Sequence, residues 1–168
     1  MAKSCCFTEI KAHKNNILDI IPVLSTEWSI SLNVRRDQSI PFVGNTTCSV
    51  FQLRANDTEK KEYGRRTPFI GVVPSSGKFH ISSAVKGNWN WWRNLNGLSE
   101  DQTHNIEIHQ RYASNGNYRY FIKVDGQEVY SVLNTDARQF YNIKVYASGP
   151  FRDACPAYVK DLKFTNFL

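Results

Sequence analysis

The sequence lacks the features that would mark it as a membrane protein. No apolar run is long enough to cross a bilayer, because residues 17–24, the best candidate, form a short run that contains Asp19 and Pro22. The first residues, MAKSCCFTEIKAHK, contain no apolar core of a signal peptide. The chain is therefore either cytosolic or one part of a longer secreted protein.

Cysteine is scarce and is not arranged for metal binding. The four cysteines, Cys5, Cys6, Cys48 and Cys155, form no C-x-x-C pair, and no histidine lies at ligand spacing, so a zinc site is not expected. Four cysteines allow three disulfide pairings, which stay open here. Adjacent Cys5 and Cys6 would point to opposite faces of a strand, so at most one of them faces a core. Glycosylation sequons at Asn45 and Asn56 favour an extracellular location.

Positive charge exceeds negative charge, but it is not concentrated. The chain has 21 Lys and Arg against 15 Asp and Glu, a formal net charge of +6. Apart from Lys60-Lys61 and Arg65-Arg66 the basic residues are scattered, and no helix-turn-helix, RNA-recognition or zinc-knuckle motif is present. The sequence therefore predicts a solvated basic surface and no nucleic-acid partner.

Amphipathic helices are also missing, although residues 98–105 and 135–140 could each hold a helical turn. Short alternating segments are abundant instead. Residues 27–35 alternate most clearly, with Trp28, Ile30, Leu32 and Val34 expected to face a core. Further strands are predicted at residues 5–12, 17–24, 48–55, 67–73, 78–85, 141–147 and 157–164. Residues 37–47, 56–66, 87–97 and 148–156 are expected to be loops.

Residues 104–133 predict three consecutive antiparallel strands. Asp125-Gly126 is a strong signal for a two-residue hairpin turn. This turn would pair Val124 with Gln127, Ile122 with Val129, Tyr120 with Ser131, Lys123 with Glu128 and Phe121 with Tyr130.

The preceding turn contains Asn115-Gly116. A three-residue loop, Ser114-Asn115-Gly116 with Gly116 left-handed, would pair Ile108 with Ile122 and Ile106 with Val124, whereas a two-residue turn would mix the two faces. We therefore prefer the three-residue loop. This register places Arg111 opposite Arg119, an unfavourable pair unless an anion or water separates them.

Many short strands joined by Gly, Pro and Asn turns predict an all-β fold. The succession EWSISLNV, GKFHISSAV, HNIEIHQ, YRYFIKVDGQEVYSV, YNIKVYAS and YVKDLKFTNF resembles the concanavalin A-like, laminin-G-like jelly roll over nearly the whole chain. The resemblance implies a single domain, residues 1–168, built as an antiparallel two-sheet jelly-roll β-sandwich with ligand loops at one rim. It also implies that the last strand pairs near the first.

The segment Asn88-Trp89-Asn90-Trp91-Trp92-Arg93-Asn94 holds three of the four tryptophans. A sugar site needs an aromatic platform and planar hydrogen-bonding groups, and this expected loop supplies both. Two alternatives remain: Trp89 and Trp91 (or Trp92) could seal the end of the sandwich, or an exposed Trp could bind a protein.

Other polar residues are weaker candidates for the same site. Arg65 and Arg66 could form a wall for an acidic glycan, although a solvated turn is the simpler interpretation. Asp153 and Arg152 are candidates only by their place in a rim loop, residues 148–156. His80 and His109 are expected on the face opposite the aliphatic stripe, where polar surface is the simpler interpretation.

Catalytic motifs are absent. The chain has no G-x-S-x-G, HExxH or P-loop, and it lacks the Glu-x-Asp-x-x-Glu strand motif of the glucanases in the resembled superfamily. The question of a calcium cofactor is left open. Some domains of the family that the chain resembles bind calcium, but the sequence contains no clustered Asp or Asn residues with the spacing of oxygen ligands. We therefore predict a non-enzymatic, secreted carbohydrate-binding module with glycans or glycoproteins as partners. An extracellular protein-interaction module is the alternative, and a polysaccharide hydrolase is a weaker one.

Overall fold

The structure is a computed structural model that describes residues 2–5, 9–42, 44, 46–55, 59–96 and 102–167. These residues form strands and loops only. The strands are β1 (Ala2–Cys5), β2 (Ile10–Lys11), β3 (Ile17–Leu24), β4 (Glu27–Arg36), β5 (Cys48–Arg54), β6 (Phe69–Val73), β7 (Lys78–Val85), β8 (Asn88–Leu95), β9 (Thr103–Ser114), β10 (Asn117–Val124), β11 (Gln127–Asn134), β12 (Phe140–Tyr146) and β13 (Ala157–Phe167).

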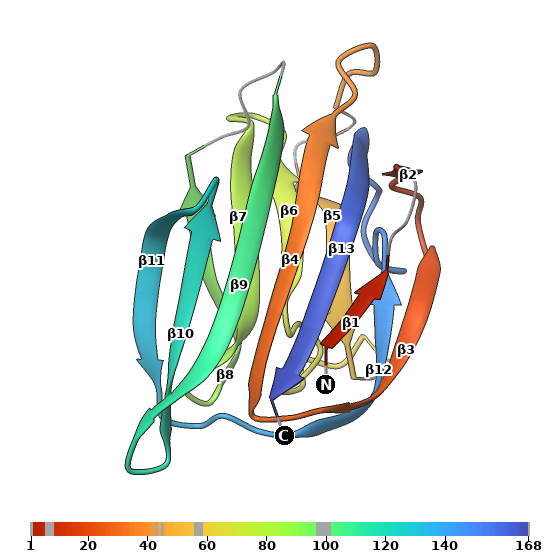
Figure 1. The fold of residues 1–168 in the computed structure, drawn as a ribbon. Helices are drawn as coiled ribbons and strands as arrows, with labels where there is room; N and C mark the ends of the chain where they lie inside the picture. Colours follow the sequence, from red (N-terminus) through yellow and green to blue (C-terminus); the bar gives the residue numbers. More distant parts are fainter. Residues whose placement is uncertain are drawn as a thin grey trace.

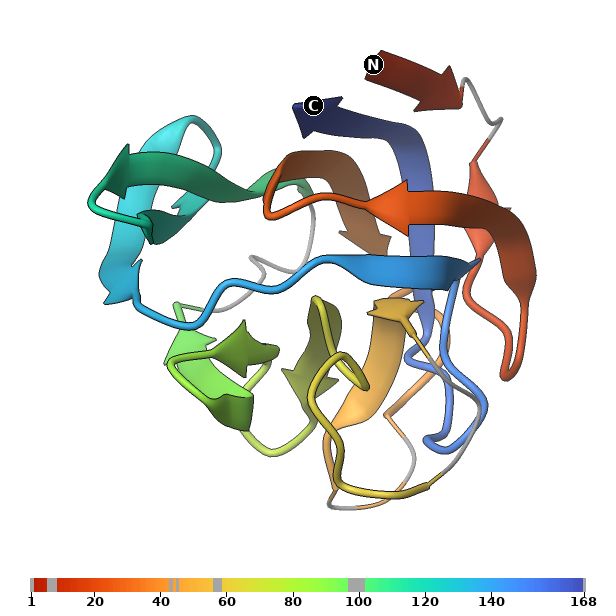
Figure 2. The same ribbon diagram turned by 90° about the horizontal axis from the view of Figure 1, so that it is seen from below.

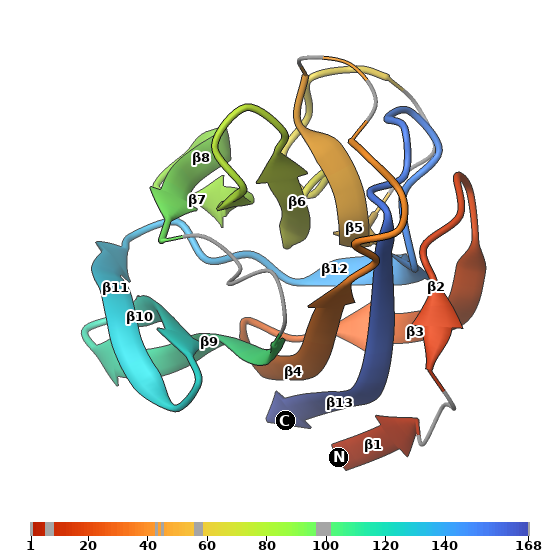
Figure 3. The same ribbon diagram turned by 90° about the horizontal axis from the view of Figure 1, so that it is seen from above.

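The strands build two antiparallel sheets (Figure 1). Sheet A has the order β1-β13-β4-β9-β10-β11, with β2 also paired to β13, and sheet B has the order β3-β12-β5-β6-β7-β8. Seen end-on, β5 to β8 lie in one layer and β4, β9, β10 and β13 lie in the other (Figures 2 and 3). The predicted two-sheet jelly roll is confirmed, and β13 pairs with β1 as expected.

The core lies between the two sheets. Trp28, Ile30, Leu32 and Val34 of β4 are each at most 1% exposed, as their alternation predicts. Trp28 packs edge-on against Tyr120 of β10, with ring centres 6.5 Å apart. The apolar side chains of β4 thus identify the buried face of sheet A.

The β9–β10 register agrees with the predicted pairing of Ile108 with Ile122, and of Arg111 with Arg119. The turn itself differs from the prediction. Asn115 and Gly116 form a two-residue turn with φ of 51° and 74°, and the extra residue is Ala113, which bulges out of β9. A bulge in the strand restores the same register as a longer loop would.

The β10–β11 register is predicted correctly only beside the turn. Lys123 pairs with Glu128 and Val124 with Gln127, as expected. Val129 is then an extra, bulged residue, so the predictions that pair Ile122 with Val129, Tyr120 with Ser131 and Phe121 with Tyr130 are wrong. Ile122, Tyr120 and Phe121 pair instead with Tyr130, Val132 and Ser131. The bulge turns the apolar Tyr130 and Val132 toward the core, and Val129 is left 43% exposed.

Three other predictions need correction. Residues 5–12 are not one strand, because Glu9 and Ala12 lie outside the strands and β2 consists of Ile10 and Lys11 alone. Residues 135–140 hold no helical turn, and the proposed turn at 98–105 overlaps β9 at its end, while residues 97–101 lie outside the described part. The expected loop at residues 87–97 is mostly strand β8.

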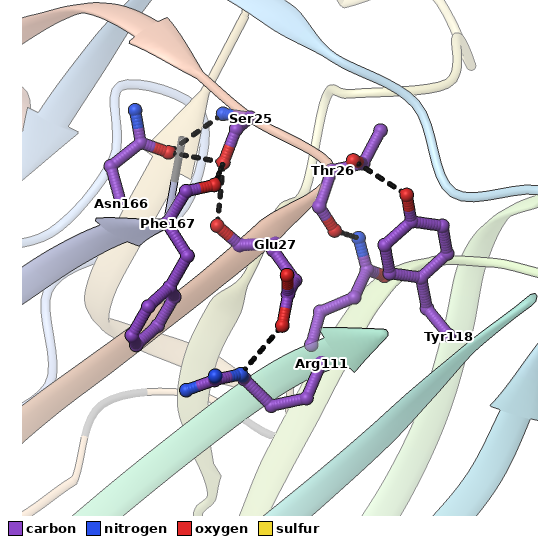
Figure 4. A network of polar contacts seen from close by, with 8 residues as sticks. Ser25, Thr26, Glu27, Arg111, Tyr118, Asn166 and Phe167 are labelled. Carbon is purple, nitrogen blue, oxygen red and sulfur yellow. Dashed lines mark hydrogen bonds and ion pairs between the residues drawn. The ribbon is translucent and has the colours of Figure 1, made fainter. Parts of the chain in front are cut away.

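A polar network closes the end of the sandwich where β3 turns into β4 (Figure 4). The side-chain Oδ1 of Asn166 in β13 accepts a hydrogen bond from the backbone N–H of Ser25 at 2.8 Å. Nearby, Arg111 donates from Nε to Glu27 at 2.8 Å. Arg111 therefore has an acidic partner of its own, and Arg119 is paired with Glu128, which explains how two arginines tolerate opposite positions.

Candidate functional site

The tryptophan-rich segment forms a hairpin with β7. Lys86 and Gly87 both have positive φ, 55° and 73°, which is the backbone of a two-residue hairpin turn. Ser82 pairs with Trp92, and Ser83 pairs with Trp91. The prediction of a loop is therefore wrong. The sequence signal that it overlooked is the alternation of β8 after a Lys-Gly turn.

Because β8 is a strand, its side chains alternate between two environments. Trp91 faces sheet A, packs against the core and donates from Nε1 to the Tyr130 hydroxyl at 2.8 Å. Arg93 lies on the same side, with its guanidinium 5.0 Å from the Trp91 ring centre and 4.7 Å from that of Tyr130. Trp91 and Arg93 are thus separated by the sheet from the other predicted site residues.

The outer face of sheet B carries Trp92, His80 and Asn94. Trp92 is 50% exposed and stacks on the His80 ring, with centres 5.5 Å apart. The His80 Nδ1 lies 2.8 Å from Oδ1 of Asn94. A half-exposed indole is thereby held against the His80 ring next to an amide, an arrangement that suits stacking on a sugar.

Trp89 reaches the same face through a bulge. Ser83 pairs with Trp91 and Val85 with Asn88, so two residues, Trp89 and Asn90, stand opposite one residue of β7. Asn88, beside the turn, accepts a hydrogen bond from the backbone N–H of Asn90 at 2.9 Å. The bulge brings Trp89 next to two arginines, since the guanidinium groups of Arg65 and Arg66 lie 5.5 and 5.3 Å from its ring centre.

Beside Trp89 the outer face is hollowed into a cavity of about 600 Å³, which we call the arginine basin. Its walls come from β5, β6, the connection between them, the β2–β3 turn and the loops before β5 and after β12. The lining residues are Lys14, Thr46, Gln52, Arg54, Glu59, Lys61, Arg65, Arg66, Phe69, Phe151, Arg152 and Asp153. Six of these are cationic and two are acidic.

A disulfide holds one wall of the basin in place. Cys48 at the start of β5 is bonded to Cys155. Ser49 strengthens the junction, since its N–H donates to the Asp153 carbonyl and its carbonyl accepts from the Cys155 N–H, both at 2.8 Å. The loop that carries Phe151 and Arg152 is therefore fixed beside the connection between β5 and β6 (Figure 3).

Two arginines of the basin, Arg54 and Arg66, are buried, and Arg65 and Arg152 are partly buried. Arg54 is 1% exposed and Arg66 is 8% exposed, so the prediction of a solvated turn is wrong for Arg66. Burial, together with the charges of Arg152, Arg65 and Arg54, lowers the pKa of Arg66 to about 10. Burial and the charge of Arg65 also lower the pKa of Arg152. Like charges at this spacing repel, and they favour a bound anion.

Hydrogen bonds orient these guanidinium groups through neutral oxygens. Arg66 donates to the Asn90 side chain, Arg152 donates to the Thr47 carbonyl at 2.9 Å, and Arg65 donates to the Glu59 carbonyl at 2.6 Å. Neutral acceptors fix a donor in place without cancelling its charge. The basin thus keeps its positive potential.

His80 connects the basin to the Trp92 platform. Its ring packs edge-on against Phe69, a lining residue, with centres 6.1 Å apart. Burial first, and then the charges of Arg66 and Arg152, lower the pKa of His80. The imidazole is therefore neutral at pH 7 and presents one donor and one acceptor.

The structure gathers most of the predicted site residues on this one face, namely Trp89, Asn90, Trp92, Arg65, Arg66 and, at the rim, Asp153, which is paired with Lys14 at 3.6 Å. Sequence reasoning identified Arg152 by its place in the loop and missed Gln52, Arg54, Phe69 and Phe151. The alternation of β5 marked Gln52 as facing away from Phe51, but it could not show that loops cover that face.

Among the described residues, no group of three His, Cys, Asp or Glu side chains is placed to hold a metal ion. The same residues contain no helix long and apolar enough to cross a membrane.

Comparison with known proteins gives a likeness of fold. No protein family and no curated protein matches the sequence. Among solved structures, a variant of alginate lyase Aly36B in complex with alginate tetrasaccharide has a TM-score of 0.57 at 13% identity, covering 95% of this chain and 80% of the lyase. The SAP-like pentraxin of Limulus polyphemus has a TM-score of 0.58 at 11% identity, covering 92% and 73%. The Caenorhabditis elegans galectin LEC-6 has a TM-score of 0.51 at 13% identity, covering 94% and 96%.

These proteins share the concanavalin A-like jelly roll, and the present chain has that fold. Both lectins and polysaccharide lyases occur among its structural neighbours. The fold therefore leaves the activity to be argued from the site.

Proposed function

We propose that the chain is a non-enzymatic carbohydrate-binding module that holds glycans on the outer face of sheet B. The observation that carries the proposal is the Trp92–His80–Asn94 platform beside Trp89 and the arginine basin. An exposed indole offers a face for the C–H groups of a sugar ring, and the neighbouring amides and guanidinium groups offer planar hydrogen bonds to its hydroxyls. A galectin and an alginate-bound lyase of the same fold add support.

Two features support a binding role and a secreted location. Among the described residues, the lining of the basin has two carboxylates, Glu59 and Asp153, and Asp153 is paired with Lys14, so these residues offer no pair of free acids for hydrolysis. The Cys48–Cys155 disulfide favours an oxidising compartment, and we propose that the protein is secreted.

The test is a glycan array, with and without a calcium chelator, followed by calorimetric titration of the glycans that bind. Trp92→Ala is expected to weaken binding about 5- to 150-fold, if stacking of a sugar ring contributes as much as base–aromatic stacking, roughly 1–3 kcal/mol. Tyr141→Ala is the matched control, since Tyr141 is an aromatic residue that is 60% exposed and lies outside the proposed site.

Three outcomes contradict the proposal. One is a wild-type protein that binds no glycan, and another is binding that the Trp92 change leaves unaltered. The third is the release of unsaturated or reducing ends from the same glycans, which would make the module an enzyme. A protein partner retained in excess free sugar would favour the adhesion alternative.

A further inference from the structure

We propose that the arginine basin is a seat for an acidic substituent, a carboxylate or a sulfate, so that the glycan class recognised by this module is an acidic one. The inference deepens the proposed function and rests on it for the sugar part of the ligand. The anion seat itself stands on separate observations.

The first observation is the concentration of positive charge in one hollow. The lining has a formal excess of four positive charges, against +6 for the whole chain, although the basic residues are scattered in the sequence. The fold gathers them from positions as distant as Lys14 and Arg152. Clefts lined by charge of one sign concentrate ions of the opposite sign.

The second observation is an unpaired buried donor. Among the described residues, Nε of Arg65 is buried and has no hydrogen-bond partner. The Arg65 guanidinium also lies between two aromatic rings, 5.5 Å from the centre of Trp89 and 5.9 Å from that of Phe151. The rings restrict the guanidinium plane, and the Nε–H is a polar group that the protein itself leaves unsatisfied.

The third observation is the match between guanidinium groups and the proposed ligand. Arginine binds carboxylate and sulfate oxygens through two parallel N–H donors, which are stronger than bonds between neutral groups. Arg66 and Arg152 flank the same ring, because their guanidinium groups lie 5.1 and 5.8 Å from the centre of Phe69. The paired N–H donors of several guanidinium groups can therefore bind one anion.

The shape of the basin favours a saccharide over nucleic acid. A volume of about 600 Å³ is within the range that holds a small ligand, roughly 300–1,000 Å³. Nucleic-acid surfaces follow a phosphate backbone with an extended basic stripe, whereas these cations line a hollow that adjoins the Trp92 platform. An acidic sugar ring in the basin would place its neighbour on that platform.

The test is calorimetric titration of wild type, Arg65→Gln and Arg152→Gln with three probes at one ionic strength. Alginate oligosaccharide supplies carboxylates, heparin oligosaccharide supplies sulfates, and cellotetraose is neutral. Arg65 and Arg152 are chosen because they are only partly buried, and thermal unfolding checks that both variants fold. Each change is expected to weaken the preferred acidic probe at least about tenfold, the loss of roughly one charged hydrogen bond.

Arg119→Gln is the matched control. Arg119 lies on β10 in sheet A and is paired with Glu128. Its substitution removes the same charge as the other two changes, but from a surface away from the basin. Its effect is expected to stay below about twofold, the size of a general change in net charge. Equal losses in all three variants would overturn the basin as the seat.

Failure of this inference and failure of the proposed function give different results. If Trp92→Ala weakens all glycans while Arg65→Gln and Arg152→Gln weaken none, the module binds sugars and the anion seat is wrong. If no glycan binds, sodium sulfate is titrated while the Nε–Hε signals of the arginines are followed by NMR. A saturable shift of Arg65 Nε supports the seat, and its absence overturns it. Single-stranded DNA that binds more tightly than either acidic glycan also overturns it.

Discussion

The guanidinium of Arg66 lies 5.3 Å from the centre of the Trp89 ring. Arg66 comes from the connection before β6, and Trp89 comes from β8, so β6 and β7 separate them in the chain. Their contact joins the aromatic strand to the arginine basin. The Trp92 platform and the arginine basin are therefore parts of one face. Substitutions in the platform and in the basin can be compared in the same binding experiment.

The two adjacent tryptophans Trp91 and Trp92 are expected to respond oppositely to substitution. Trp91→Ala removes packing against the core and the hydrogen bond to Tyr130, so it should lower the free energy of unfolding by about 2–4 kcal/mol. Trp92→Ala removes an indole that is 50% exposed, and its cost should be below about 1 kcal/mol. Urea unfolding of both variants measures the difference.

Trp91→Ala and Trp92→Ala should also differ in their effect on glycan binding. Trp92→Ala weakens glycan binding in a protein that stays folded, whereas Trp91→Ala acts only through stability. Binding lost in a fully folded Trp91→Ala variant, with none lost in Trp92→Ala, would reverse the assignment of the two faces of β8.

Local sequence patterns predicted much of the fold. The alternation of residues 27–35 identified the buried face of β4, and Asp125-Gly126 fixed the first pairs of the β10–β11 hairpin. These predictions succeed because turn chemistry and the period of two act between neighbours in the chain. The predicted pairing beyond Glu128 was wrong because of the bulge at Val129. Packing in the core decides that bulge, since it favours Tyr130 and Val132 over Val129 at inward positions.

The arginine basin could not be predicted in the same way. Its members lie in the β2–β3 turn, β5, β6 and three loops, and no period connects Lys14 with Arg152. Burial of Arg54 and Arg66 depends on loops that cover the outer face of β5, so their side chains carry no local sign of it. Arg65 and Arg66 were recognised as candidates only because they are adjacent in the sequence.

Removing the disulfide is expected to destabilise the protein and to weaken the basin. Cys48 and Cys155 are 107 residues apart, and a link across a loop of that size contributes on the order of 4–5 kcal/mol in the chain-entropy description. The Cys48→Ala/Cys155→Ala variant should therefore unfold at a lower guanidinium concentration. Affinity for an acidic glycan should also fall, because the loop with Phe151 and Arg152 loses its anchor. An unfolding midpoint equal to that of wild type would contradict the pairing.

Stability is expected to fall as the pH drops below about 6.5. Burial lowers the pKa of His80 and, against the opposing effect of Glu107, that of His109. Below about pH 6.5 these two histidines bind more protons in the unfolded chain than in the folded one. Their contribution to the free energy of unfolding is therefore fully present above this pH and is lost as the pH falls. Unfolding free energies at pH 7.5, 6.5 and 5.5 test this.

The controls for the pH dependence are single substitutions. His80→Gln and His109→Gln should each flatten the decline. A decline of equal slope in wild type and in both variants would assign it to other groups.

The amide of Asn134 is expected to be the most sensitive polar group outside the basin. It is fully buried at the end of β11, and its Oδ1 accepts from the N–H of Lys86 at 2.8 Å, in the turn that starts the aromatic strand. Its Nδ2 donates to Oε1 of Gln110 at 2.7 Å, and Gln110 in turn donates to the Thr26 carbonyl at 2.8 Å. This chain of bonds ties the β7–β8 turn to sheet A.

Asn134→Ala should therefore cost about 2–4 kcal/mol, since it leaves buried donors and acceptors without partners. Gln127→Ala, an exposed amide at the start of the same strand, should cost less than about 0.5 kcal/mol. A double-mutant cycle with Gln110→Ala should give a coupling of about 0.5–3 kcal/mol between the two amides. Because the Lys86 turn sets where β8 begins, Asn134→Ala should also weaken glycan binding in the folded fraction. Additive losses in the cycle, with unchanged glycan affinity, would show that Asn134 does not position the aromatic strand.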